Sequence, residues 1–293
     1  MFPEVQRTEI DREKVAGFTS EWDHMALAIA LLREAASYVC ICACIMGDQP
    51  SWSRDQAIIG GHAVRLFKLL SALLDQVCQR RRETADILLR LVFETCVNVR
   101  FLMQEWSAEL ADSYVRVSLR HERKLRDTID ANVLARNGDV LPIEDRMLRS
   151  LDRAARLAGI PLDTVDLKQK ASWGGKHLAQ KAKDVGWLYA YDSVFGGMSH
   201  SVHGSWQDLY AHHLEVEEDG RFVPKLHWTK PRPQPLFVTA TLAIQVAAEV
   251  AQFLGGEAAL DQLDPLLADL DRRIREADSL HEAYLAPKAW PEV

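Results

Sequence analysis

Histidine and serine residues that could do acid–base chemistry gather in one short stretch. Phe195-Gly-Gly-Met-Ser-His-Ser-Val-His-Gly-Ser205 contains two histidines and three serines within eleven residues. Imidazole titrates near neutral pH, so it can act as a general acid or a general base. On a helix, residues three or four positions apart share a face, and His200 and His203 have that spacing. We take His203 and Ser199 as candidate catalytic residues, and His200 and Ser205 as secondary candidates.

A second group of candidates lies upstream, in the apolar segment Leu89-Arg-Leu-Val-Phe-Glu-Thr95. Arg90 and Glu94 are four residues apart, which lets their side chains meet on a helix. A charged pair inside an apolar helix must find partners that offset its desolvation. Two interpretations stay open: a structural salt bridge, or an arginine that grips an anion beside a glutamate that faces the histidines.

Arg116 and His121 form a third candidate pair, with four residues between them. HEPN-type ribonucleases use this spacing, and in them the two side chains handle the scissile phosphate and the 2′-hydroxyl. Arginine offers phosphate a bidentate fork, and histidine offers a proton near neutral pH. The helix expected over residues 108–136 alternates charges as a solvated face does. We therefore interpret the match as a coincidence and retain both residues as secondary candidates.

The motifs predict neither a metal nor an organic cofactor. His200 and His203 could share a metal ion with Glu94 or His62, but di-iron bundles need two Glu-x-x-His motifs. Only Glu21–His24 has that pattern. The chain also contains no His-Glu-x-x-His, no Gly-x-Ser-x-Gly and no glycine-rich phosphate loop, which argues against the corresponding protease, hydrolase and nucleotide-binding classes.

The whole chain has the composition of an ordinary soluble protein. Of its 293 residues, 48% are hydrophobic and 26% are charged, and the net charge of -7 disfavours non-specific binding to nucleic acid or anionic lipid. The apolar run 25–46 carries Arg33 and Glu34 in its middle, so we expect a core helix rather than a membrane span. The five cysteines lack metal-ligand spacing and are expected to be buried free thiols. The first ten residues lack the features of a signal peptide, and we expect a cytoplasmic protein without membrane association.

Apolar residues at three- and four-residue spacing predict helices over most of the chain. The expected helices cover residues 21–46, 53–79, 83–106, 108–136, 143–158, 174–184, 187–212, 235–254 and 257–284. Residues 214–228 instead alternate apolar and polar side chains around Asp219-Gly220, which indicates a β-hairpin. We expect a single all-α domain over residues 1–293, a multi-helix bundle with this one small hairpin and a C-terminal helical pair over 235–284.

Three motifs follow one another along the chain: Arg90-Leu-Val-Phe-Glu94, Ser172-Trp-Gly174 and Ser199-His-Ser-Val-His-Gly-Ser205. Together they resemble the uncharacterised bacterial helical family called domain of unknown function 5677, over residues 60–215. The resemblance implies a helical fold and no established activity. Some relatives resemble defence-associated HEPN proteins.

Carried over by position, the family pattern matches Arg90, Glu94, Ser199, His203 and Ser205. A tyrosine that family members often have four residues before the serine is Phe195 in this chain. Tyr191 lies one helical turn away, and we keep it as a secondary candidate for a hydroxyl role.

Two functions stay open, and the sequence does not decide whether the protein is an enzyme. In the first, the four main candidates converge in a pocket where His203 is the general acid or base and Arg90 grips an anion. The reaction would be metal-independent cleavage of RNA or a nucleotide by a bacterial defence ribonuclease. In the second, the same residues form a structural polar network. The surface or the hairpin 214–228 then binds a protein partner or a second copy of the chain, and a homo-oligomer is expected.

Overall fold

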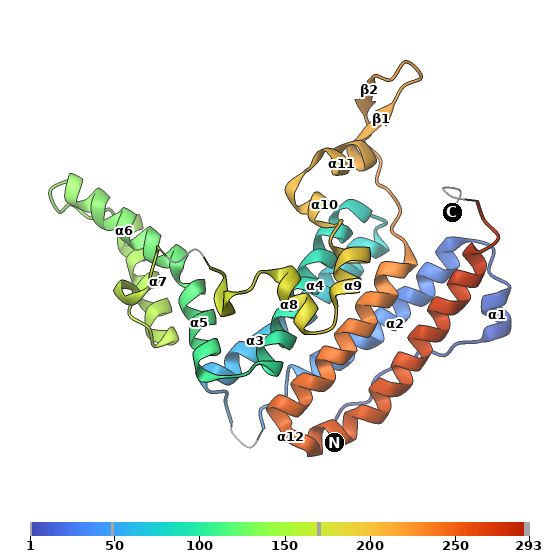
Figure 1. Cartoon of the computed structure of the whole chain (residues 1–293), viewed down its shortest axis with the longest axis horizontal. Coiled ribbons are helices and arrows are strands. Elements are labelled where there is room, and N and C mark those ends of the chain that lie inside the picture. The colour runs from blue at the N-terminus through green and yellow to red at the C-terminus, as the bar shows by residue number, and fades with distance from the viewer. Residues whose placement is uncertain (1, 48–49, 169–170, 290–293) are drawn as a thin grey trace.

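The computed structural model describes residues 2–47, 50–168 and 171–289 of the chain. Within these residues the protein is built from helices and one small two-stranded antiparallel sheet (Figure 1). The predicted all-α architecture with one hairpin is therefore confirmed. A short helix near the N-terminus, α1 (Arg12–Ala16), packs beside the last helix.

Four long helices form the central bundle: α2 (Glu21–Cys42), α3 (Arg54–Cys78), α4 (Arg82–Gln104) and α12 (Pro233–Leu285). In space, α12 packs on α2, α2 on α3 and α3 on α4, and α12 also touches α4. Leu31, Leu66, Phe93 and Phe237 are among the large side chains that fill the shared core. The sequence predicted all four helices because each buries an apolar stripe in this core.

The last helix, α12, consists of two helices joined at Gly256, in agreement with the expected pair of helices over 235–254 and 257–284. Gly256 has a φ of 68° and a ψ of -170°, a conformation that glycine adopts without steric cost. The second half of α12 folds back along the first half (Figure 1). The C-terminal helical pair is therefore a hairpin of two antiparallel helices that covers α2.

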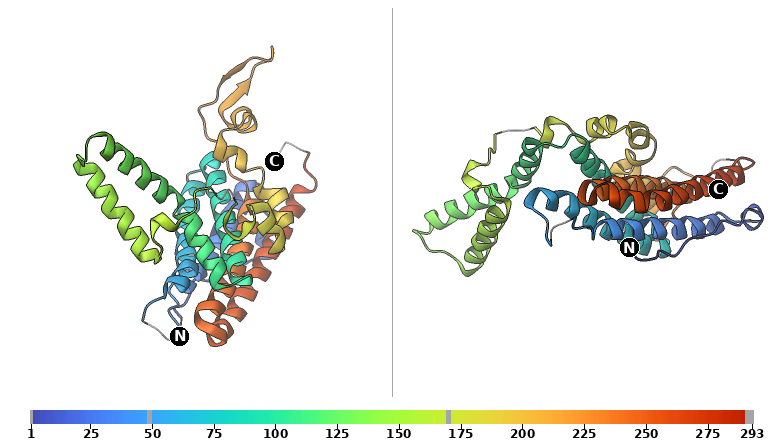
Figure 2. Two further views of the ribbon diagram at one scale, coloured as in Figure 1. Left: turned by 60° about the vertical axis from the view of Figure 1, so that its left-hand side comes forward. Right: turned by 90° about the horizontal axis from the view of Figure 1, so that it is seen from below.

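A helical arm projects from the bundle (Figures 1 and 2). It consists of α5 (Ala108–Ser118), α6 (Arg120–Ala135), α7 (Pro142–Ala158) and the short turn η1 (Leu162–Thr164). The single helix expected over 108–136 is wrong because the chain breaks at Leu119. That side chain is buried with Ile129 and Leu151 in a small separate core, and the break lets α6 turn and pack on α7.

The continuous helix expected over 187–212 is also wrong. This region contains short pieces: α9 (Leu188–Ala190), the π-helical turn η3 (Tyr191–Phe195), α10 (Ser199–His203), α11 (Trp206–Asp208) and a second π-helical turn, η4 (Leu209–His213). Gly204 ends α10 in the left-handed region, with a φ of 59°, where a side chain is strained. Upstream lie η2 (Trp173–Gly175) and α8 (Leu178–Asp184). Downstream, β1 (Leu214–Val216) pairs with β2 (Phe222–Pro224), and Val216 faces Phe222 across the hairpin.

Three of the described helices, α2, α3 and α12, are long and apolar enough to cross a membrane by length and composition. In this fold, 67% of the apolar window of α2 is buried inside the protein. The five cysteines are free thiols, but only Cys42 and Cys96 are fully buried. The expected burial is wrong for Cys44 and Cys78, which are exposed because each lies at or just beyond a helix end.

Candidate functional site

One helix, α4, carries a row of polar residues four positions apart: Arg82, Asp86, Arg90, Glu94 and Asn98. A step of four residues advances about 40° beyond a full helical turn, so the row winds around the helix. Its first two members line one cavity and its last two line another. Sequence analysis found only the central pair, although the same spacing would have found the others.

Arg90 anchors the π-helical turn to α4. Its Nη1 donates a hydrogen bond of 3.0 Å to the carbonyl oxygen of Phe195, and its guanidinium carbon lies 5.2 Å from the centre of the Tyr191 ring. The Phe195 ring stacks on Phe93, with 4.4 Å between ring centres. Arg90 forms no salt bridge with Glu94, so the structural salt-bridge interpretation of this pair is wrong, and the anion-binding role of Arg90 stays a prediction.

The first cavity, which we call the His212 cavity, has a volume of about 700 Å³. It lies between the start of α4, the segment from η3 to η4, and the stretch that leads into α12. Its polar lining consists of Arg82, Asp86, Ser193, His200, Ser201, Gln207, Asp208, His212, Thr229, Arg232 and Gln234. Volumes of this size are typical of sites for small molecules and cofactors.

Asp86 is a buried carboxyl in this cavity. Burial raises the pKa of Asp86 to about 6, and the nearby carboxylates of Glu83 and Asp208 add to the rise. Arg82 opposes it, since its Nε donates to Asp86 Oδ2 at 3.4 Å. The result is a carboxyl group that exchanges its proton close to neutral pH, as acid–base catalysis requires.

His212 lies beside a second buried carboxylate. Its Nδ1 is 3.4 Å from the hydroxyl of Thr229 and 3.9 Å from Oε1 of Glu83. Burial lowers the pKa of His212 below its ordinary value of 6.5, so the ring is neutral at pH 7 and the contact with Glu83 is not an ion pair at that pH. These neighbours favour the tautomer with the proton on Nδ1, which leaves Nε2 as a base.

Buried polar atoms around the His212 cavity lack partners. Among the described residues, Glu83 Oε2, Asp208 Oδ1 and Gln234 Oε1 are buried and accept no hydrogen bond. Of the other carboxylate oxygens, Glu83 Oε1 accepts a hydrogen bond from the Thr229 N–H at 2.9 Å, and Asp208 Oδ2 lies 3.3 Å from His213 Nε2. Native proteins pair nearly all such atoms, so these three oxygens are available to accept hydrogen bonds from a ligand or from water.

The predicted histidines fall on different surfaces. His200 lines the His212 cavity, and its Nδ1 lies 2.7 Å from Oγ of Ser205 across the turn at Gly204. His203 is exposed and Ser199 is half-buried, and neither lines this cavity. The expected convergence of both with Arg90 and Glu94 in one pocket is therefore not seen. The helix breaks at Gly204, so the face of a continuous helix does not exist here.

Glu94 faces the second cavity, which we call the Lys181 cavity. Its volume is about 240 Å³, and its lining is Glu94, Asn98, Val117, Arg120, Ser172, Trp173, Lys176, Leu178 and Lys181. Two of the three sequence motifs, Arg90–Glu94 and Ser172–Gly174, thus meet here rather than beside the histidines. Lys181 was missed because an isolated lysine on a short helix carries no spacing signal.

The Arg116 and His121 pair is divided between two helices. Arg116 belongs to α5, where its Nε donates to Asp112 at 2.7 Å and its Nη1 donates to Thr164 at 3.2 Å. His121 is exposed at the start of α6, which lies on the projecting arm, away from α10 and α11 (Figure 1). Arg116 has these two structural partners, and the coincidental match of the pair stays an interpretation.

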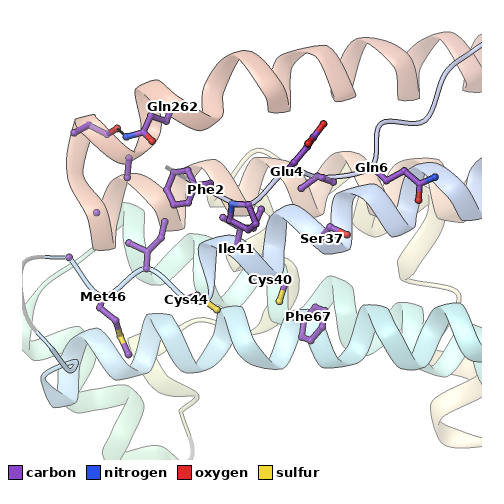
Figure 3. Close-up of a pocket in the computed structure, with 17 residues that line it drawn as sticks. Phe2, Glu4, Gln6, Ser37, Cys40, Ile41, Cys44, Met46, Phe67 and Gln262 are labelled. Atoms are coloured by element: carbon purple, nitrogen blue, oxygen red, sulfur yellow. Dashed lines mark hydrogen bonds between the residues drawn. The ribbon is translucent and has the colours of Figure 1, made fainter.

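A further cavity of about 740 Å³ lies where the N-terminal segment crosses α2 and α3. Figure 3 shows Phe2, Ile41, Met46 and Phe67 around it, with the thiols of Cys40 and Cys44 on the same side of α2. Burial raises the pKa of the Cys40 thiol, so this thiol is protonated at neutral pH and a poor nucleophile. This cavity offers space but little chemistry.

The residues considered for a metal ion lie apart. His62 is buried on α3 with its ring centre 5.5 Å from that of Tyr114, and Glu94 faces the Lys181 cavity. Across 2–47, 50–168 and 171–289, no three His, Cys, Asp or Glu side chains are grouped so as to hold a metal ion.

Comparison with known proteins identifies a family but no activity. A model of the family of unknown function DUF5677 matches residues 56–222, more than half of the chain. That stretch holds the Lys181 cavity and most of the His212 cavity. No curated protein and no solved structure matches the chain, and the analogy to HEPN-type proteins finds no support among them. The chain belongs to the family of unknown function DUF5677.

Proposed function

We propose that this protein is a metal-independent phosphodiesterase that cleaves RNA or a nucleotide in the His212 cavity. The observation that carries the proposal is the joint presence of a neutral imidazole, a carboxyl group whose pKa is about 6 and two arginines in one open cavity. These are the groups that phosphodiester cleavage needs: a base, an acid and a positive charge for the phosphate.

In the proposed reaction, Nε2 of His212 takes the proton from the 2′-hydroxyl of a bound ribonucleotide. The 2′-oxygen attacks the phosphorus, and the bond from phosphorus to the 5′-oxygen breaks. Asp86 gives its proton to that leaving oxygen, so the products are a 2′,3′-cyclic phosphate and a 5′-hydroxyl. Arg82 and Arg232 stabilise the negative charge on the phosphate, and both catalytic groups exchange protons with water through the open cavity.

Acidic side chains also lie at the cavity, and their negative charge repels a long polyanion more than a small substrate. Two of these groups have donors that offset their charge, namely Arg82 Nε beside Asp86 and the Thr229 N–H beside Glu83. The net charge of the chain is -7, which repels a long polyanion. We therefore expect a dinucleotide or an exposed single-stranded loop to be cleaved better than a long duplex.

Cleavage of a labelled RNA pool in the presence of a chelator tests the proposal. The variant His212→Ala should lose at least roughly a hundredfold in rate, the contribution typical of one acid–base group. His203→Ala is the matched control, since this exposed histidine lies nearby but outside the cavity. Equal loss in both variants, or cleavage by neither them nor the wild type, overturns the assignment.

A second function, association of two copies of the chain, is supported by exposed aromatic side chains at the hairpin. Trp206 is 57% exposed and packs edge-on against Phe222 at 5.3 Å, and Leu226 is 91% exposed. Exposed aromatic patches are typical of protein–protein interfaces. The double variant Trp206→Ser, Phe222→Ser should convert a dimer to a monomer in light scattering. A wild-type chain that is already monomeric refutes it.

The cellular setting belongs to the same proposal. Free cysteines, two of them exposed, suit a reducing compartment such as the bacterial cytoplasm. An RNA-cleaving activity there fits a role in bacterial defence, and expression of the wild-type chain but not His212→Ala should slow growth of a bacterial host.

A further inference from the structure

Lys181 is a buried lysine with an unusual environment. Its side chain, on α8, is 2% exposed, and its Nζ lies 2.9 Å from the centre of the Trp173 ring and 5.7 Å from that of Phe101. No hydrogen bond to Nζ is formed by any residue that the structure describes. The face of the Trp173 ring offsets part of the cost of burying this ammonium group, and its N–H donors remain available to an anion in the cavity.

The groups that face Lys181 leave an excess of positive charge. Glu94 approaches from α4 and Arg120 from α6, and Lys176 lies on the turn before α8. Lys176 is already paired with Asp184 at 2.8 Å. Arg120 uses Nη1 to donate to the carbonyl oxygen of Ala171 at 3.1 Å, while its Nη2 is buried with no partner in the described chain.

We propose that the Lys181 cavity binds a small oxyanion, a phosphate or a carboxylate, through the ammonium of Lys181 and the guanidinium of Arg120. The volume of about 240 Å³ accommodates an anion of a few heavy atoms. Asn98 and Ser172 line the same cavity and supply neutral donors to its remaining oxygens. The site is separate from the His212 cavity, with which it shares no lining residue.

Binding at this site is coupled to a proton. Burial lowers the pKa of Lys181 to about 7, and Glu94 opposes this only in part. A bound anion favours the charged ammonium and raises the pKa again, so binding takes up a proton. Affinity is therefore full below pH 7 and falls as the pH rises above it. Arg120 and the Lys176–Asp184 pair also lie at the site.

Calorimetric titration with sulfate and with acetate tests the proposal. Sulfate represents phosphate but does not titrate near neutral pH, and acetate represents a carboxylate, so the two arms distinguish the anion classes. The wild type should bind at least one of them, roughly tenfold more weakly at pH 8 than at pH 6 because the protonated fraction of Lys181 changes by that factor. Lys181→Met should weaken binding by roughly tenfold or more, whereas Lys183→Met, an exposed lysine on the same helix, should leave it unchanged.

A second variant, which is expected to strengthen anion binding rather than weaken it, keeps the test decisive if Lys181→Met does not fold. Glu94 is exposed, so Glu94→Gln should fold. At about pH 5, well below the pKa of Lys181, it should bind the anion more tightly than the wild type because a competing negative charge is gone. The proposal is overturned if neither anion binds the wild type, if Lys181→Met binds as tightly as the wild type, or if Glu94→Gln binds more weakly.

Discussion

Arg90 and Phe195 are joined by a hydrogen bond of 3.0 Å from Nη1 to a backbone carbonyl oxygen, across 105 residues of sequence. The carbonyl lies at the end of a π-helical turn. The N–H of Ser199, which would bond to it in a regular helix, donates to Gly196 instead at 3.1 Å. Arg90 thus satisfies a carbonyl oxygen that has no partner within the broken helix. The hydrogen bond also fixes this segment, which forms one wall of the His212 cavity, to α4.

Replacing Arg90 with methionine should destabilise the protein by roughly 1.5–3 kcal/mol, the usual value for a hydrogen bond that involves a charged group. Chemical denaturation measures this loss. Arg33→Met, an exposed arginine on α2, should change stability by less than about 0.5 kcal/mol. Equal stability of wild type and Arg90→Met would mean that the hydrogen bond does not position the cavity wall.

The rate of RNA cleavage should depend on pH in two ways. His212 must be neutral, so the rate rises with pH through the lowered pKa of His212. Asp86 must be protonated, so the rate falls as the pH rises through about 6. The profile is therefore bell-shaped and centred on the acid side of neutrality.

Asp86→Asn should flatten the alkaline limb of this profile and lower the rate at its maximum. Initial rates over a pH series would reveal this change. A profile that keeps its alkaline limb in Asp86→Asn would assign the acid to another group.

Acid should destabilise the fold through buried histidines between the start of α2 and the end of α12. His281 and His24 are almost fully buried, with 4.9 Å between their ring centres. Burial lowers the pKa of His281 to about 4 and also lowers that of His24. Between pH 6.5 and 4, the unfolded chain therefore binds more protons than the folded one, and stability falls as the pH falls.

Each such histidine contributes at most about 1.4 kcal/mol per pH unit to this loss. The variant His281→Phe should reduce the slope of stability against pH without removing it, because His24 and His62 are also buried neutral. Urea unfolding at a series of pH values would measure the slope. An unchanged slope in His281→Phe would show that this residue is protonated in the folded protein.

The long helices were predictable because apolar residues recur at three- and four-residue spacing along the whole length of each one. The apolar stripe of α3 includes Leu66, Leu70 and Leu73, all buried, and spacing alone reveals it. The reversal at Gly256 was also readable, since two adjacent glycines interrupt the pattern. The helix break at Leu119 was not predicted because the burial of this side chain depends on contacts with α7. The residues around Leu119 in the sequence do not reveal those contacts.

Of the candidate site residues named from the sequence, only one lines the His212 cavity. Sequence analysis located the segment that forms the cavity wall and included His200, which does line it. It preferred His203, which the turn at Gly204 leaves exposed. His212 is buried beside Glu83, which lies 129 positions earlier on α4, and a contact over that separation has no local signature in the sequence.

The central claim is that His212 and Asp86 cleave a phosphodiester with the substrate's own 2′-hydroxyl as the nucleophile. The most direct test incubates the protein, with chelator, with one RNA oligonucleotide and its all-deoxy counterpart, and then determines the product ends by mass spectrometry. The account predicts that the RNA alone is cut, that it carries a 2′,3′-cyclic phosphate, and that His212→Ala abolishes this product while His203→Ala does not. Uncut RNA, or equal cutting of the DNA, would contradict it.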